Sequence, residues 1–299
     1  MKIFLDTREA IMWQAIAQQI SDVTKRPFTI SDRETINGGE INDCYMISNG
    51  SERYFVKVND RAELPIFETE VESLTQLDKS DHIFVPKPIH IGVTKTHSFL
   101  VLNYLPTKVM DKKASYDLGI SLAHHHLWGD QLEYGFDGDN YLGSVLQVNT
   151  WHRRWDCFFA EQRIGWQLQL LHEKGMFLGD IDTLVNNSKK ILHNHNPKPS
   201  LLHGDFWHGN VSLSVKGPIV YDPACYWGDP ECDLAMATLF GGFQDSFFEG
   251  YLSIRDIEEG FETRQNLYNL YHVLNHCNMF GGEYLNHAQQ LIDKLNLTH

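Results

Sequence analysis

One loop constrains this sequence more than any other feature, because residues 203–210 read HGDFWHGN. Asp205 and Asn210 lie five positions apart in it, and a glycine stands beside each of them. A short apolar run, PIVY, then leads to Asp222. Such a run between turn residues is typical of a strand, so we expect a loop and a hairpin-like unit that gathers two carboxylates and an amide.

Composition argues against several classes of partner. The 299 residues carry 25 Lys and Arg against 39 Asp and Glu, a formal charge of −14, whereas nucleic acids and anionic membranes need a basic face. The first residues, MKIFLDTREA, have no cationic stretch before an apolar segment, and no run of about 18 apolar residues occurs. We therefore expect a cytoplasmic protein with no nucleic-acid or membrane partner.

Cysteines and histidines give no metal or disulfide pattern. The five cysteines are scattered and include no C-x-x-C, so we expect reduced, mostly buried thiols. Three consecutive histidines at 124–126 diverge by about 100° from one to the next on a helix and cannot chelate together. We expect His126 to serve packing or hydrogen bonding.

The first third of the chain predicts a small antiparallel sheet with helices. Helical apolar spacing marks residues 8–22 and 63–80, whereas 33–58 reads as a three-strand meander and 84–106 as two further strands. Beyond Pro106 the pattern is mainly helical, over 117–130, 151–175 and 263–295, and residues 201–230 are the one strand-rich interruption that we expect there.

These patterns predict an α+β fold with two lobes. Residues 1–105 would form a lobe with a small antiparallel sheet and one main helix, and 106–299 a larger, mostly helical lobe.

The loop at 203–210 fits phosphoryl transfer from ATP. That reaction needs a carboxylate to orient the acceptor hydroxyl and take its proton, and oxygen ligands for Mg²⁺. Asp205 fits the first role, and Asn210 and Asp222 fit the second. The spacing equals the D-x-x-x-x-N of the kinase catalytic loop, with Asp222 in the place of the DFG aspartate.

A cation for the phosphates is expected on the sheet. Lys57 lies in YFVKV on the third predicted strand, and its partner should be a glutamate of the next helix. Glu70 is favoured because its spacing from Phe67 turns it toward the packed face, whereas Glu68 and Glu72 should be solvated.

Two further segments could contact the nucleotide. In NGGEIND, Gly38, Gly39 and Asn42 lie between the first two strands, where backbone N–H groups could approach phosphates, although Gly-Gly is also an ordinary hairpin turn. The backbone of Asn103, Tyr104 and Leu105 could hydrogen-bond an adenine edge, or simply form a buried strand.

With these residues the chain resembles the fructosamine-3-kinases, also called ketosamine-3-kinases, which are relatives of aminoglycoside and choline kinases within the protein-kinase-like fold. The matching segments include FVKVN, YGFDGDNYLG, FFAEQRIGWQLQL, LLHGDFWHGN and YDPACYWGDPECDLAM. The resemblance implies an ATP- and Mg²⁺-dependent kinase for the O3 hydroxyl of a ketosamine, either a small molecule or a glycated amine or protein. It also implies a role in deglycation, because the phosphorylated adduct is unstable.

The same resemblance suggests roles around the loop. Trp207 could offer its ring to the C–H face of the sugar, and Trp227 and Asp229 could border that pocket. Asp233 is expected to anchor the loop by accepting backbone hydrogen bonds, His203 to support it, and His208 to be exposed. Some relatives carry a cysteine just after the loop glycines, but Glu40 stands there, so a redox switch is not expected.

Two alternatives stay open at this point. The substrate could be another hydroxylated amine, such as an aminoglycoside or choline, since acidic residues would suit a cationic amine in each case. The chain could also be a catalytically silent kinase-like binding protein, although every catalytic position is filled. The length of the ketose, fructosyl, ribulosyl or erythrulosyl, is not fixed by the motifs.

Overall fold

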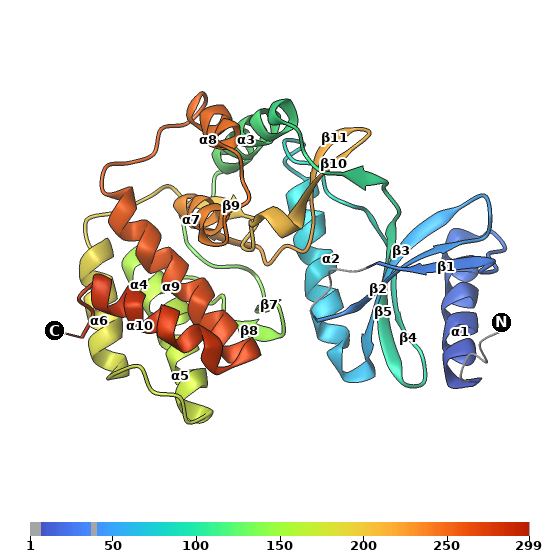
Figure 1. Ribbon diagram of the computed structural model, residues 1–299, viewed down its shortest axis with the longest axis horizontal. Helices are drawn as coiled ribbons and strands as arrows, with labels where there is room; N and C mark the ends of the chain where they lie inside the picture. The colour runs from blue at the N-terminus through green and yellow to red at the C-terminus, as the bar shows by residue number, and fades with distance from the viewer. Residues whose placement is uncertain (1–6, 37–40, 299) are drawn as a thin grey trace. The chain divides into compact units, whose positions relative to one another are not determined.

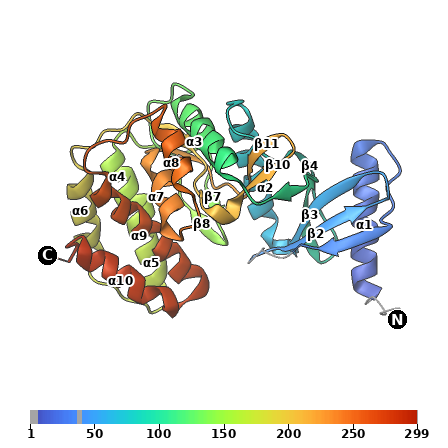
Figure 2. The same ribbon diagram turned by 45° about the horizontal axis from the view of Figure 1, so that its top comes forward.

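The computed structural model describes residues 7–36 and 41–298 (Figures 1 and 2). The chain divides into two compact units, one of residues up to 75 with 85–107, the other of 76–84 with 108–299. A boundary after residue 105 stays a prediction. None of the described helices is long and apolar enough to cross a membrane.

The first unit is a five-stranded antiparallel sheet with two helices, as the sequence predicts. The strands follow the order β1-β2-β3-β5-β4. Their bounds are β1 (Asp32–Thr35), β2 (Asp43–Ser48), β3 (Arg53–Asp60), β4 (Pro88–Val93) and β5 (His97–Asn103), and the helices are α1 (Thr7–Thr24) and α2 (Leu64–Asp78).

Helix α1 covers one side of this sheet (Figure 1). Its apolar side chains, with Trp13 and Ile16 at the centre, pack on Val56 of β3 and on Phe99 and Val101 of β5. Period-2 alternation in the strands and period-3.6 spacing in the helix thus form one core.

The second unit is mainly helical. Its helices are α3 (Lys112–Leu127), α4 (Trp155–Phe159), α5 (Trp166–Glu173), α6 (Ile181–Leu192), α7 (Glu231–Leu239), α8 (Asp245–Leu252), α9 (Phe261–Phe280) and α10 (Leu285–Lys294). Its short strands are β7 (Asn140–Leu142), β8 (Val145–Gln147), β9 (Ser200–Leu202), β10 (Val211–Ser214), β11 (Gly217–Val220) and β12 (Tyr226–Gly228). The chain passes from the first unit to the second within β6 (Thr107–Lys108).

One expectation about this unit is wrong. Residues 201–230 are not the only strand-rich interruption, because β7 and β8 form a separate antiparallel hairpin at 140–147. Each strand has only three residues, which is too short for an alternating pattern to show in the sequence.

Helices α3 and α8 cross with their backbones in close approach. A Cβ at Gly119 would lie 2.0 Å from the carbonyl oxygen of Phe247, and one at Gly250 would lie 2.1 Å from that of Tyr116. Glycine at both positions therefore allows this crossing, which fixes Phe247 beside the HGDFWHGN loop.

Candidate active site

In the first unit, Lys57 and Glu70 form a buried ion pair. The Lys57 Nζ lies 2.7 Å from the Glu70 Oε1, and the two residues are 3% and 8% exposed. Lys57 stands in the centre of the sheet, opposite Cys44 of β2 and Leu100 of β5. Glu68 and Glu72 are exposed, so the expected pairing is confirmed, while binding of a nucleotide stays a prediction.

The other nucleotide candidates of this unit have ordinary partners. Asn42 accepts a hydrogen bond from Asn59 at 2.8 Å through its Oδ1, and Asn103 accepts one from the Lys87 backbone N–H. Tyr104 and Leu105 are half-buried. Gly38, Gly39 and Glu40 lie outside the described residues.

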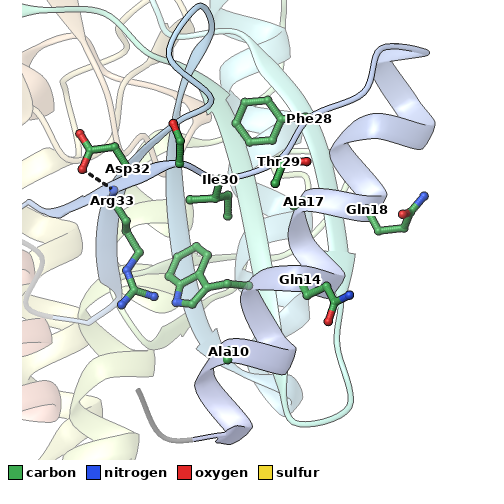
Figure 3. A pocket seen from close by; sticks show the side chains of 11 residues that line it. Ala10, Gln14, Ala17, Gln18, Phe28, Thr29, Ile30, Asp32 and Arg33 are labelled. Carbon is green, nitrogen blue, oxygen red and sulfur yellow. Dashed lines mark hydrogen bonds between the residues drawn. The ribbon is translucent and has the colours of Figure 1, made fainter. Parts of the chain in front are cut away.

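A pocket of about 640 Å³ lies elsewhere on this unit, between α1 and residues 28–33 (Figure 3). Trp13 and Phe28 line it, and the Arg33 guanidinium stands over the Trp13 ring at 4.7 Å. None of the candidate site residues lines this pocket.

In the second unit, Asp205, Asn210 and Asp222 are brought together by a hairpin. The Asn210 Nδ2 donates to the Asp205 Oδ2 at 2.9 Å and to the Asp205 carbonyl at 3.0 Å. Strands β10 and β11 pair antiparallel, and the Tyr221 N–H donates to the Asn210 carbonyl at 3.0 Å. The hairpin therefore ends at Asn210 and Tyr221, which face each other, and Asp222 is the next residue in the chain.

Asp233 holds the start of the loop. Its carboxylate accepts the backbone N–H of His203 at 2.8 Å and that of Gly204 at 2.9 Å, and it contacts the His126 Nε2 at 3.1 Å. The expected anchoring is confirmed, and His126 is the hydrogen-bonding residue that we expected. These bonds favour the charged form, so the pKa of Asp233 lies below its usual value despite the opposing effect of burial.

Only glycine fits at position 204, where the loop is anchored to Asp233. Its φ is +81°, a left-handed conformation, and a Cβ there would lie 2.0 Å from the carbonyl oxygen of Ala224. His203 is fully buried, and its Nε2 lies 3.1 Å from the Tyr221 carbonyl, so it supports the loop as expected. Burial lowers the pKa of His203, which favours the neutral imidazole. His208 is exposed, as we expected.

The charge of Asp222 disfavours ionisation of the neighbouring Asp205 carboxyl group. Burial, and then the neighbouring charge of Asp222, raises the pKa of Asp205 to about 7. A divalent cation beside Asp222 would relieve this repulsion. The donor set suits such a cation, because the Asp222 carboxylate and the Asn210 Oδ1 are hard oxygen ligands and the Asn210 amide makes its hydrogen bonds to Asp205 through Nδ2.

The predicted substrate residues fall in different surroundings. Trp207 is half-buried beside Phe240, and the Trp227 ring stacks on Trp128 with centroids 6.1 Å apart. Asp229 is 1% exposed and accepts a hydrogen bond from Tyr268, with His195 at 2.6 Å. Their binding of substrate stays a prediction.

Comparisons with known proteins agree on one family. The fructosamine kinase family model matches residues 12–298. A protein named as a probable ketoamine kinase from Vibrio parahaemolyticus is 55% identical over 285 residues, which cover 95% of this chain and 99% of that protein.

The chain belongs to the fructosamine kinase family.

Solved structures agree with this membership. A fructosamine kinase relative from Haemophilus somnus, named as a putative fructosamine-3-kinase, superposes with a TM-score of 0.90 at 36% identity, over 96% of this chain and 98% of that one. The choline kinase LicA from Streptococcus pneumoniae (TM-score 0.64, 15% identity, 95% and 98% covered) shares the fold, as does a thermostable mutant of the aminoglycoside phosphotransferase APH(4)-Ia (0.63, 14%, 93% and 97%). The fold is therefore protein-kinase-like, and family membership makes the chain a kinase-type phosphotransferase.

A buried arginine in the family segment FFAEQRI has a role that the sequence did not reveal. Arg163 is fully buried within a π-helical turn, Ala160–Gly165, and donates to the Val148 carbonyl and to the Asn149 Oδ1. Its guanidinium lies 4.0 Å from the centroid of the Tyr226 ring. Such turns often occur near functional sites, because the extra residue redirects a side chain.

The contacts of Arg163 continue to the backbone just after Asp222. The Asn149 amide donates to the Asn140 Oδ1 at 2.9 Å, and Asn140 donates to the Cys225 carbonyl at 2.8 Å. Gln147 donates to the Ala224 carbonyl at 3.2 Å. Residues from 140 to 163 thus hold the backbone at Ala224 and Cys225, two and three residues after Asp222. In the sequence, the apolar residues around FFAEQRI indicate a core helix, and nothing more specific points to this hydrogen-bond network.

Proposed function

We propose that this fructosamine kinase relative transfers the γ-phosphate of ATP to the O3 hydroxyl of a ketosamine. The observation that carries the proposal is the Asp205–Asn210–Asp222 unit, in which one carboxylate is fixed by an amide while a second lies close enough to raise its pKa. That arrangement suits proton transfer from an alcohol beside a metal-bound phosphate.

Asp205 acts as the base and orienter of the acceptor. Its carboxylate accepts the hydrogen bond of the O3 hydroxyl and takes the proton as the oxygen–phosphorus bond forms. The bond from the γ-phosphorus to the bridging oxygen breaks, and ADP leaves with that electron pair. Asn210 keeps the carboxylate in place through the 2.9 Å hydrogen bond from its Nδ2.

Asn210 and Asp222 would hold Mg²⁺ through their side-chain oxygens. The bound ion would neutralise charge on the phosphate oxygens. The hairpin of β10 and β11 fixes the two ligands by paired backbone hydrogen bonds.

Lys57, held by Glu70, is proposed to contact the α- and β-phosphates of ATP. Glu70→Gln removes the charge that holds the ammonium group and should lower kcat/KM for ATP about tenfold, which equals about 1.4 kcal/mol. Initial rates over a range of ATP concentrations measure this. Glu72→Gln, on the exposed face of the same helix, is the matched control and should leave the value unchanged. An equal loss in both variants would contradict the role of the pair.

The product gives the proposed physiological role. A phosphate at O3 of the ketose makes the adduct unstable, so the amine would be released and glycation reversed. Small-molecule ketosamines and glycated amines of proteins both carry the required hydroxyl.

The decisive experiment is an assay across ketosamines of different sugar length. The protein with ATP and Mg²⁺ should phosphorylate a fructosyl, ribulosyl or erythrulosyl amine, and ³¹P NMR of the product should place the phosphate on O3. Choline and an aminoglycoside should not be phosphorylated under the same conditions. Phosphorylation of these alone would contradict the proposal, as would a lack of turnover with every ketosamine.

A further inference from the structure

A row of aromatic side chains runs along the second unit from the HGDFWHGN loop. The Trp207 ring lies 5.9 Å from Phe240, the residue directly after α7, and Phe240 lies 5.0 Å from His276 of α9. The His276 ring then lies 5.6 Å from Phe280 and 5.0 Å from Tyr284, all measured between centroids. These five residues are called the aromatic row.

The aromatic row starts at the proposed base. The backbone N–H of Trp207 donates to the Asp205 carbonyl at 3.1 Å, so the ring stands two residues from the carboxylate on the same tight turn. Gly209 lies under this ring, because a Cβ there would approach it to 2.3 Å. The indole is therefore positioned by the turn itself.

A second stack of rings holds the segment that follows Phe240 against the loop. Phe206, next to Trp207, is fully buried and stacks on Phe243 at 5.3 Å and on Phe247 at 5.6 Å. The intervening Gly241 and Gly242 have φ of +66° and +92°, which lets the chain turn sharply after Phe240.

The row is solvent-accessible rather than core. Phe240 is 36% exposed and Phe280 is 42% exposed, while the other three rings are half-buried. Contiguous exposed aromatic side chains are typical of a binding surface. The His276 Nδ1 lies 2.8 Å from the carbonyl of His272, so this imidazole nitrogen already has a partner within its own helix.

We propose that the aromatic row binds the amine side of the ketosamine and gives a preference for amines with an aromatic substituent. This rests on the proposed function. Trp207, at the start of the row, would meet the C–H face of the ketose, whose hydroxyls need hydrogen-bonding groups nearer Asp205. The rest of the row offers mainly ring faces, which suit the amine side. The secondary ammonium would lie over a ring face, and the substituent would pack on Phe240 and Phe280.

Two ligands that differ only in the substituent test this directly. Fructosyl-benzylamine should bind about fivefold more tightly than fructosyl-methylamine, measured by calorimetry with ADP and Mg²⁺ so that no turnover occurs. Phe280→Ala should bring the ratio of the two dissociation constants to within about twofold. Phe280→Trp should retain the preference, because it keeps an aromatic face.

Phe177→Ala is the matched control. Phe177 is 67% exposed and lies edge-on to His172 at 4.7 Å, so it is also a phenylalanine beside a histidine ring, but it lies between α5 and α6. This variant should leave the ratio unchanged. Equal affinities in the unaltered protein, a ratio unaffected by Phe280→Ala, or an equal effect of Phe177→Ala would overturn the proposal.

Turnover separates this inference from the proposed function. If fructosyl-methylamine is phosphorylated at O3 but shows no weaker binding than the benzyl ligand, the function stands and the aromatic row is not the amine subsite. If the binding preference is present and responds to Phe280→Ala without phosphorylation of either ligand, the subsite stands and the proposed function fails.

Discussion

Replacing Asp205 with alanine is expected to lower kcat for ketosamine phosphorylation by about 10²–10⁴-fold, the range for loss of a positioned general base. The carboxylate is the group that the Asn210 amide holds in place, so the substitution removes the positioned base itself. Nucleotide binding should be largely retained, because the proposed metal ligands Asn210 and Asp222 remain. Single-turnover rates and calorimetric titration with Mg²⁺ and ATP measure the two effects separately.

Asp205→Asn is the sharper variant for the same position. It keeps the shape of the side chain and a hydrogen-bonding oxygen for the Asn210 amide, but it cannot accept a proton. We expect it to be nearly as inactive as the alanine variant while unfolding at the same urea concentration as the unaltered protein. Rates close to those of the unaltered protein in Asp205→Asn would remove Asp205 from the role of base.

Replacing Asp233 with alanine is expected to destabilise the fold by about 3 kcal/mol. The change leaves the buried N–H groups of His203 and Gly204 without their acceptor, and it removes the partner of the His126 imidazole. The start of the loop would lose its anchor, so phosphorylation should fall together with stability. Urea unfolding followed by fluorescence gives the free energy of unfolding.

An exposed acid provides the control for this variant. Asp137→Ala removes a solvated carboxylate of the same unit and should change the free energy of unfolding by less than about 0.5 kcal/mol. A similarly small effect of Asp233→Ala would show that solvent or another group can satisfy the two N–H groups.

Local patterns predicted most of the framework of the candidate site. The period-2 and period-3.6 patterns placed Lys57 on β3 and Glu70 on the packed face of α2, and the 2.7 Å ion pair follows from those two placements. The short run PIVY predicted the strand that returns Asp222 to Asn210. Each of these relations depends on neighbours within about twenty residues, which is the range over which sequence periodicity is informative.

Relations between distant segments were not predictable in the same way. Arg163, in its π-helical turn, is linked through Asn149 and Asn140 to the Cys225 carbonyl. The bond from Asn140 to Cys225 alone joins residues that are 85 positions apart. A buried arginine paired with amides and carbonyls, rather than with a carboxylate, leaves no charge pattern in the sequence. The short strands β7 and β8 were missed for lack of length.

The sequence by itself therefore determined the two-lobed α+β plan, the buried Lys57–Glu70 pair and the Asp-Asn-Asp unit, because each is encoded in the spacing of nearby residues. Only the tertiary structure decided that Asp229 lies in a buried network with Tyr268, whereas Trp207 lies beside the partly exposed Phe240. The physical reason is that exposure and side-chain contacts depend on which helices pack together. Close backbone approaches such as that at Gly119 and Gly250 set this packing, and no local pattern records it.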